Sequence, residues 1–520
     1  MSFIIQSIQT AGRLLNKRSG LLFFVLWVLL AFFLKLPRYI PLEPQGIHFI
    51  RQTDGMAFMM GYYQFGNAFF EPRVYDLLGE NGRAASEFPL MYYIGAGLAK
   101  ILGPSMGIMR GLSLLVSLLG LWSLFQILYK ESQRFLLSFS GALVSMLGVV
   151  YFYYAINTIP DIHALGFCMM AWYFFYRFYV EFKKSHLYWA TLFFALASLI
   201  KITFLIQPLA CFVVLWFFFP KNDIIGGWNR KQWLKGTGLM ALIAVLCSLA
   251  WVLYAKWYNQ QSGAWYFLSR ARPIWELNGE QIREQFTFVM EYWGESYFHV
   301  KIWKLWGAVF LFNLYGSYKL RTIWNSVHWI LLGGLVAYAL FFFRQFADHD
   351  YYFLLFYPWF GFSVLALILN MRALFPRVYK GIFPPLLLLF FCYIGLIQTE
   401  SLLTKRFAHD DYFAAPCLPL KGFYQTLDSL QIPQDARFVI LGDISINGSQ
   451  YFIRRQGYSV HDTSEGQFRI MENLREKQGY EYALSIDSLS FGRYIDSWNM
   501  KLLHSRPGIA LYKIEGKAEK

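Results

Sequence analysis

The chain has 520 residues, of which 57% are hydrophobic, 20% aromatic and only 15% charged, and its mean hydropathy is +0.36. About a quarter of the residues are charged in an ordinary soluble domain, so this composition excludes that class. The formal net charge of +15 could suggest a nucleic-acid binder, but the basic residues stand at the ends of apolar segments and form no nucleic-acid motif. We therefore expect them to set membrane topology and to meet anionic membrane lipids, with no nucleic-acid partner.

Apolar runs of about twenty residues recur along the chain, and this is the pattern of transmembrane helices. Basic segments such as "EFKKSH" and "YKLR" fall on one side of the membrane if the N-terminus is cytoplasmic. The pattern predicts a polytopic α-helical membrane protein with about 11 to 13 transmembrane helices. The clearest segments are 20–37, 107–129, 135–155, 162–180, 187–203, 204–219, 236–255, 301–318, 325–343, 351–370 and 381–398.

One apolar segment, "FPLMYYIGAGLAKILG" at residues 88–103, does not fit this alternation. It is shorter than the ~20 residues that a crossing needs, and a crossing here would move the later basic segments to the other side. We therefore expect a juxtamembrane helix on the outer face. It closes the first outer loop, which we place at residues 38–106.

Beyond residue 398 the pattern changes to short apolar runs separated by helical segments. The runs "ARFVILGD", "YALSID" and "GIALYKIE" have the length of strands, whereas "GSQYFIRRQG" and "RIMENLREKQG" have the character of helices. This alternation predicts a small extracytoplasmic α/β domain over residues 399–520, beside a transmembrane domain over residues 1–398. The C-terminal segment has no phosphate-binding glycine loop, so we expect it to cap a site or to present an acceptor.

Three acidic residues stand where the predicted outer segments meet the membrane. Asp54 lies in "RQTDG" and Glu87 in "SEFPL", both in the first outer loop, and Asp161 ends the turn "NTIPD". Solvation of a loop explains each one alone, but together they place three carboxylates at one level of the bilayer. Such carboxylates can act as a general base on an acceptor hydroxyl when the electrophile arrives on a lipid.

A reaction of this kind also needs cations near a departing phosphate, whose charge Arg or Lys can stabilise. Lys201 in "SLIKITFLIQP" is notable because it lies between two apolar runs, where a charge without a partner is costly. Snorkelling of its side chain to the interface explains it equally well. The candidate cations on the outer side are Arg51, Arg73, Lys201, Arg270, Arg272 and Arg344.

The segment "RQFADHDYYFLLFYP" adds His349, Tyr351 and Tyr352 at the outer mouth of a predicted span. An aromatic belt at the membrane surface accounts for the tyrosines. The histidine and its neighbouring carboxylates are candidates for binding a headgroup. Their spacing matches no His, Cys or carboxylate metal cage, so we expect no metal site and no cofactor apart from a lipid-linked substrate.

The order of these segments resembles the GT-C superfamily of membrane glycosyltransferases over about residues 20–370. The nearest likeness is to its bacterial branch, the glycosyltransferase family 39-like proteins related to protein O-mannosyltransferases and the lipid A aminoarabinose transferase. The likeness rests on "RQTDGMAFMMGYYQFGN", "SEFPLMYYIGAGLAKILG", "GIMRGLSLLVSLLGL", "NTIPDIHALGF", "SLIKITFLIQP" and "HDYYFLLFYP", taken in this order.

The resemblance implies a transferase of the bacterial inner membrane with an extracytoplasmic active site. The sugar would leave a polyprenyl-phosphate donor, with inversion at the anomeric carbon, for a hydroxyl of a lipid, protein or glycan acceptor. Asp54 matches the first-loop carboxylate taken as catalytic in the superfamily, and Glu87 matches an acid that ends the same loop. The residues expected to bind donor or acceptor are Asp161, Arg51, Lys201, Arg270, Arg272, Arg344, His349, Tyr351 and Tyr352.

The sequence departs from this pattern at two places. The aminoarabinose transferases carry a basic residue directly after the Glu and another shortly after the first-loop Asp, where this chain has Phe88 and Ala57. Other cations must then meet the donor phosphate, which argues against aminoarabinose as the sugar. Two other functions remain open: a carrier or flippase for lipid-linked sugars without transfer chemistry, and a scaffold whose α/β domain binds a partner.

Overall fold

The computed structural model describes residues 18–218, 224–225, 227–264, 271–461, 464–486 and 498–515. The chain divides into two compact units. The first unit comprises the described residues of Met1–Ile40, Gly111–Trp251 and Arg270–Thr404. The second comprises those of Pro41–Arg110, Val252–Ser269 and Lys405–Lys520.

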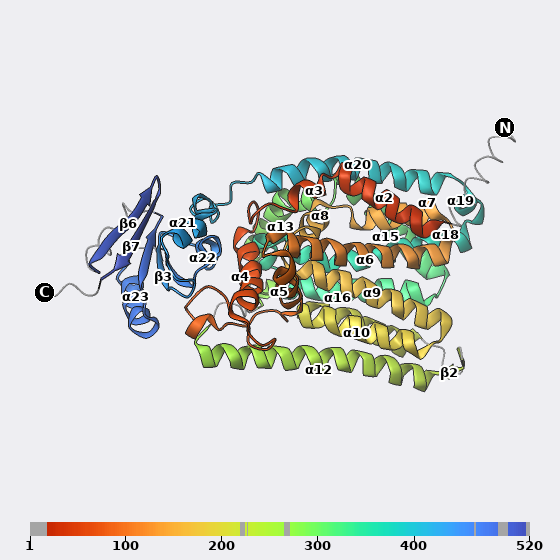
Figure 1. The fold of residues 1–520 in the computed structure, drawn as a ribbon. Coiled ribbons are helices and arrows are strands. Elements are labelled where there is room, and N and C mark those ends of the chain that lie inside the picture. The colour runs from red at the N-terminus through yellow and green to blue at the C-terminus, as the bar shows by residue number, and fades with distance from the viewer. Residues whose placement is uncertain are drawn as a thin grey trace. The chain divides into compact units, whose positions relative to one another are not determined.

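The first unit is a bundle of long helices with shorter helical pieces at their ends (Figure 1). A short hairpin of β1 (Ile224–Ile225) and β2 (Trp228–Asn229) precedes α12. The ends of α6, α12 and α20 belong to the second unit. The helices are α2 (Ser19–Phe33), α3 (Leu36–Tyr39), α6 (Met106–Ser132), α7 (Phe135–Met146), α8 (Val149–Ala155), α9 (Pro160–Glu181), α10 (Lys184–Ile200), α11 (Ile206–Phe218), α12 (Arg230–Ser262), α13 (Gly279–Tyr292), α14 (Gly294–Tyr297), α15 (Val300–Lys319), α16 (Ile323–Phe341), α17 (Gln345–Asp348), α18 (Tyr357–Leu374), α19 (Pro376–Lys380) and α20 (Phe383–Phe407).

Each of the eleven predicted spans contains a helix. Within the described part of the chain, length and composition alone mark five helical segments as able to cross a membrane: α6, α12, α16, Asp350–Leu374 and α20. The pair α7 and α8, bent by 86°, counts as a sixth if it forms one span. The other predicted spans are too short for this test or carry more polar side chains. α2 and α11, for example, have 15 and 13 residues.

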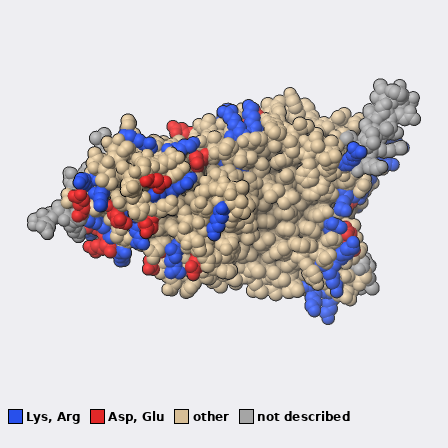
Figure 2. Space-filling model, in the orientation of Figure 1, with Lys and Arg blue, Asp and Glu red and all other residues tan. Residues whose placement is uncertain are grey.

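The surface of the first unit fits a membrane protein. In Figure 2 its lateral face is almost free of charge, and Lys and Arg side chains gather at the end where α19 and β2 lie. Inside the bundle, small residues allow close helix contacts. A Cβ added to Gly166 of α9 would lie 2.5 Å from the carbonyl oxygen of Val116 in α6, so only glycine permits this crossing.

The second unit combines two helices from the first outer segment, α4 (Phe49–Phe65) and α5 (Leu90–Leu102), with a five-stranded sheet. The strand order is β4-β3-β5-β7-β6, with β3 parallel to β4 and β5, and β7 antiparallel to β5 and β6. The strands are β3 (Phe438–Leu441), β4 (Gly457–Val460), β5 (Tyr482–Ser485), β6 (Met500–Arg506) and β7 (Ile509–Ile514). The accompanying helices are α21 (Phe423–Ser429), α22 (Gly448–Ile453) and α23 (Glu465–Gln478). This confirms the predicted mixed helix and strand content near the C-terminus.

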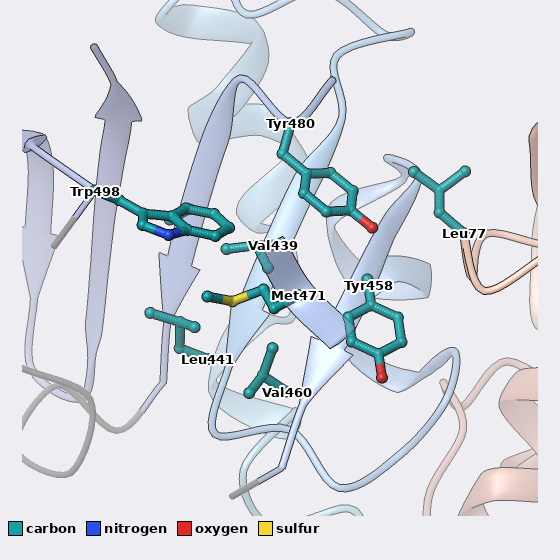
Figure 3. Close-up of a cluster of buried hydrophobic side chains, with 9 residues drawn as sticks. Leu77, Val439, Leu441, Tyr458, Val460, Met471, Tyr480 and Trp498 are labelled. Atoms are coloured by element: carbon teal, nitrogen blue, oxygen red, sulfur yellow. The ribbon is translucent and has the colours of Figure 1, made fainter. Parts of the chain in front are cut away.

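The sheet and the first outer segment share one hydrophobic core. Leu77 belongs to a cluster with Val439 of β3, Met471 of α23 and Trp498, which precedes β6 (Figure 3). The backbone around Leu77 also pairs with the edge strand β4. The Leu77 amide donates to the Gly457 carbonyl at 2.8 Å, and the Gly457 amide donates to the Tyr75 carbonyl at 3.0 Å. Two segments nearly four hundred residues apart in sequence are therefore joined inside this unit.

Candidate active site

Asp54 lies in a buried helix. The prediction that residues 38–106 form a loop around it is wrong at this point, because α4 runs from Phe49 to Phe65. The apolar run "MAFMMGYY" that follows Asp54 buries almost every face of this helix, and the carboxylate itself is only 5% exposed. Solvation therefore does not explain this acid.

Two side chains, those of Asn447 and Arg51, lie against the Asp54 carboxylate. Asn447 donates from Nδ2 to Asp54 Oδ1 at 2.8 Å, and Arg51 Nη1, one helical turn earlier, lies 3.9 Å from Asp54 Oδ2. Burial raises the pKa of Asp54 from 3.8 to about 6, against the opposing effects of Arg51 and Asn447; Glu87 raises it further. The pKa of this buried carboxyl group therefore lies well above the usual range of an aspartate.

Glu87 reaches Asp54 through a cation. Its Oε1 forms an ion pair with Arg51 Nη2, and its Oε2 accepts a hydrogen bond from the Ser86 hydroxyl. The backbone before it is fixed by Asn259 at the end of α12, which accepts from the Ala85 amide at 2.7 Å and donates to the Ala85 carbonyl at 2.9 Å. Glu87 is thus placed to orient Arg51, and Arg51 faces both carboxylates.

A second cluster lies in the helical bundle. Asp161 is in the first turn of α9, behind Pro160, and Lys201 is the residue that follows α10. Lys201 Nζ lies 3.1 Å from Asp161 Oδ1 and 3.2 Å from Oδ2, and Asp161 is only 3% exposed. An anion at a helix N-terminus and a cation at a helix C-terminus both gain from the helix dipoles. Lys201 is therefore an ion-paired residue and does not snorkel.

Aromatic rings cover this ion pair. The Lys201 ammonium lies 4.9 Å from the ring centroid of Tyr352 and 5.7 Å from that of Tyr351. The His349 ring stacks on both tyrosines, with centroids 5.8 and 5.1 Å away. Asp350, which is fully buried, accepts a hydrogen bond from the Tyr154 hydroxyl. The structure thus brings three predicted site residues, Asp161, Tyr351 and Tyr352, around the partly buried ammonium of a fourth, Lys201, with His349 stacked beside them.

The remaining predicted cations lie elsewhere. Arg272 pairs with Asp348 at 3.0 Å and Arg344 with Glu276 at 3.2 Å, and these side chains are all at least one-third exposed. The Arg344 amide also donates to the Arg272 carbonyl, so these two arginines are neighbours. Arg73 lies in the second unit, bridged to Arg83 through the backbone. Arg270 falls outside the described residues.

Sequence reasoning missed two polar residues beside Asp54. The first is Asn447, and the second is Asp76, whose amide donates to Asn447 Oδ1 at 3.1 Å. Burial raises the pKa of Asp76 to about 8, and the charges of Asp54 and Asp443 raise it further. A signal for Asn447 exists only in hindsight: an Asn-Gly pair in "LGDISINGS", directly after a buried strand.

The two departures from the aminoarabinose transferase pattern have structural roles. Phe88 packs edge to face on Phe69, with ring centroids 5.3 Å apart, and Ala57 is fully buried in α4. A basic side chain at position 57 would be buried in this helix. As for metals, no group of three or more His, Cys, Asp or Glu side chains within the described ranges could hold an ion.

Comparison with known proteins identifies the fold. The crystal structure of ArnT from Cupriavidus metallidurans bound to undecaprenyl phosphate matches with a TM-score of 0.61 at 11% identity, over 95% of this chain and 97% of that chain. The archaeal oligosaccharyltransferase AglB from Archaeoglobus fulgidus, in complex with an inhibitory peptide and a dolichol-phosphate, matches with a TM-score of 0.55 at 11% identity, over 96% of this chain and 75% of that chain. The overall fold is therefore similar to that of ArnT and AglB.

The sequence comparison agrees with the fold. Residues 86–251 match the model of the dolichyl-phosphate-mannose-protein mannosyltransferase family, a stretch that contains Glu87, Asp161 and Lys201. No curated protein sequence matches the chain. The fold and the partial family match agree with the resemblance that the motifs predict, and the apolar helices mark an integral membrane protein.

Proposed function

We propose that the protein is an inverting glycosyltransferase that moves a sugar from a polyprenyl-phosphate donor to an acceptor hydroxyl on the extracytoplasmic face of the membrane. The observation that carries this proposal is the buried Asp54 carboxylate, which has a pKa of about 6 and is held by Arg51 and Asn447. A general base works best when its pKa lies near the working pH.

The proposed reaction is a single displacement. The acceptor oxygen attacks the anomeric carbon, and its proton passes to Asp54. The bond between the anomeric carbon and the phosphate oxygen breaks, and both of its electrons leave with the polyprenyl phosphate. Attack from the face opposite the leaving group inverts the anomeric centre. Arg51, held by Glu87, keeps the charge and orientation of Asp54 suited to this step.

Lys201 is proposed to bind the donor phosphate. A lysine ammonium has three donors, so it can bind a phosphate oxygen while it remains on Asp161. Asp161 keeps the cation charged in a protein interior where an unpaired ammonium is costly. The rings of Tyr351 and Tyr352 limit access of water to this pair, which strengthens its electrostatic effect on developing negative charge.

An apolar groove in the helical bundle offers a place for the polyprenyl chain. It has a volume of about 910 Å³ and lies between α10 and α12, which run side by side in Figure 1. Its lining on α10 extends from Lys184 to Leu199, two residues before Lys201. A lipid chain in this groove would end close to the cation that we assign to the phosphate. The lipid-bound structures of ArnT and AglB support a donor of this kind.

Two substitutions on α12 test the groove. Leu239 lines it and Leu246 does not, although their side chains are equally exposed, at 53% and 54%. Leu239→Trp should raise the KM for a polyprenyl-phosphate sugar about tenfold, because the indole takes space that the chain needs, whereas Leu246→Trp should leave it unchanged. Initial rates of label transfer in detergent, measured at several donor concentrations, give the KM of each variant. Equal KM values for the two variants would contradict the assignment of the groove.

The distribution of charge supports an orientation of the protein in the membrane. The basic ends of the helices gather at one end of the bundle, which the positive-inside rule places in the cytoplasm (Figure 2). Asp161 and Lys201 belong to the opposite ends of α9 and α10 from the basic segment "EFKKSH" that joins these two helices. This arrangement supports an extracytoplasmic reaction.

A further inference from the structure

Asn447 makes the most specific contact between the α/β domain and the proposed base. Its Nδ2 donates to Asp54 Oδ1 at 2.8 Å, while its Oδ1 accepts from the Asp76 amide at 3.1 Å. The second bond fixes which end of the amide faces Asp54, because a backbone N–H can only donate. Asn447 is fully buried, so water does not compete for either bond.

The loop that carries Asn447 is held by a buried carboxylate. Asp443 accepts from the Ser445 amide at 2.7 Å, from the Ser445 hydroxyl at 2.7 Å and from the Ser449 amide at 3.0 Å. The Gly448 amide then donates to the Ser445 hydroxyl at 3.0 Å. The turn between β3 and α22 is thus fixed by side chains of its own, and Asn447 is held in the middle of it.

We propose that Asn447 is a positioning residue for the reaction described above, and that the C-terminal α/β domain thereby completes the catalytic site by holding the Asp54 carboxylate in its ionised, reactive orientation. This inference rests on the proposed function. It assigns the α/β domain a direct part in catalysis, beyond capping the site or presenting an acceptor.

Charged groups on both sides of Asp54 decide how much of it is ionised. Arg51 on α4 stabilises the carboxylate. Glu87, before α5, and Asp76, in the segment that pairs with β4, oppose it with their own negative charge when ionised. Burial also favours the protonated form, which cannot act as a base. Asn447 is the neutral donor in this set. A hydrogen bond to a charged group favours the charged form, so removal of Asn447 should leave less of Asp54 ionised at a given pH.

A structural role alone makes a different prediction. If Asn447 only joins the α/β domain to the first outer segment, its loss should lower activity equally at every pH. Gln456 provides a matched control, because its Nε2 donates to the carbonyls of Val74 and Asn81 at 3.2 and 3.3 Å and makes the same kind of link without reaching Asp54. The pH profile therefore separates positioning of the base from attachment of the domain.

The experiment compares wild type, Asn447→Ala, Asn447→Leu and Gln456→Ala. Asn447→Leu keeps the approximate shape of the side chain and has neither a donor nor a new charge, so it remains informative if the alanine variant fails to fold. We expect transfer by both Asn447 variants to fall about tenfold or more at pH 6 and much less at pH 8.5. The reason is that the rise of the transfer rate with pH, which follows ionisation of Asp54, moves to higher pH. In Gln456→Ala the transfer rate should rise with pH over the same range as in wild type.

A second readout does not depend on turnover. The infrared band of the protonated carboxyl that Asp54→Asn removes can be titrated in wild type and in Asn447→Leu. A midpoint that moves to higher pH in the variant supports the inference, and an unmoved midpoint overturns it. If the wild-type enzyme transfers sugar but the midpoint does not move, the role of Asn447 is rejected and the proposed function is not. Absence of transfer in wild type would reject the proposed function, and the role of Asn447 in it.

Discussion

Replacement of Asp54 by Asn should lower sugar transfer by about 10²–10⁴-fold, which is the usual contribution of one positioned proton-transfer group. Asn keeps the shape of the side chain and can still accept from Asn447, but it cannot take the proton of an acceptor hydroxyl. The wild-type rate should rise with pH through about 6, where Asp54 ionises, and level off above it. Initial rates of transfer between pH 5 and pH 9 measure both effects.

Stability provides the control for this variant. Because burial raises the pKa of Asp54 from 3.8 to about 6, the protonated carboxyl contributes stability that is present below pH 3.8 and is lost as the pH rises through 6. Above that pH the charged form costs on the order of 3 kcal/mol, and the Asn variant avoids this cost. Asp54→Asn should therefore melt at a higher temperature than wild type at pH 8. Glu71→Gln, a change at an exposed acid of the same segment, should alter neither rate nor stability.

Lys201→Gln should lower transfer by about 10²–10³-fold, which is typical for loss of one electrostatic contact to developing charge. It should also destabilise the protein by about 3–5 kcal/mol, because Asp161 then remains buried without its ammonium. Rates of transfer and thermal unfolding in detergent measure the two effects.

The double variant Lys201→Gln, Asp161→Asn separates these effects. Removal of both charges leaves neither one uncompensated, so much of the lost stability should return. Transfer should stay low, because the donor phosphate has lost its cation. Recovery of wild-type transfer in the double variant would show that the ion pair serves the fold alone.

Local patterns predicted much of the fold. Each of the eleven long apolar runs contains a helix, because burial in lipid or in the bundle requires every backbone group to be bonded within its own segment. The short runs "RFVIL" and "YALS" became β3 and β5, which are the buried central strands of the sheet. Strands β4 and β6 were missed. β4 has only four residues, and β6 is a mostly exposed edge strand, so neither shows a clear apolar signal.

The candidate site was also predictable only in part. Asp54, Glu87 and Asp161 stood out because acids beside membrane segments are few, and Lys201 because a charge between apolar runs is costly. The partner of Asp54 could not be predicted in this way: Asn447 lies 393 residues further along the chain, and a buried Asn in a turn looks like any other. The helix around Asp54 was taken for a loop, because Gly55 and the polar residues before it weaken the helical pattern.

The most direct test of the account follows both products of the reaction. Purified wild-type protein would be given a panel of radiolabelled polyprenyl-phosphate sugars together with cell-envelope extract as the acceptor pool, with Asp54→Asn as the blank. The account predicts that, with one donor, the label enters an acceptor and an equal amount of free polyprenyl phosphate appears, in wild type only. Label that crosses the membrane of a proteoliposome while it stays attached to its lipid, with no free polyprenyl phosphate, would contradict the account and indicate a carrier.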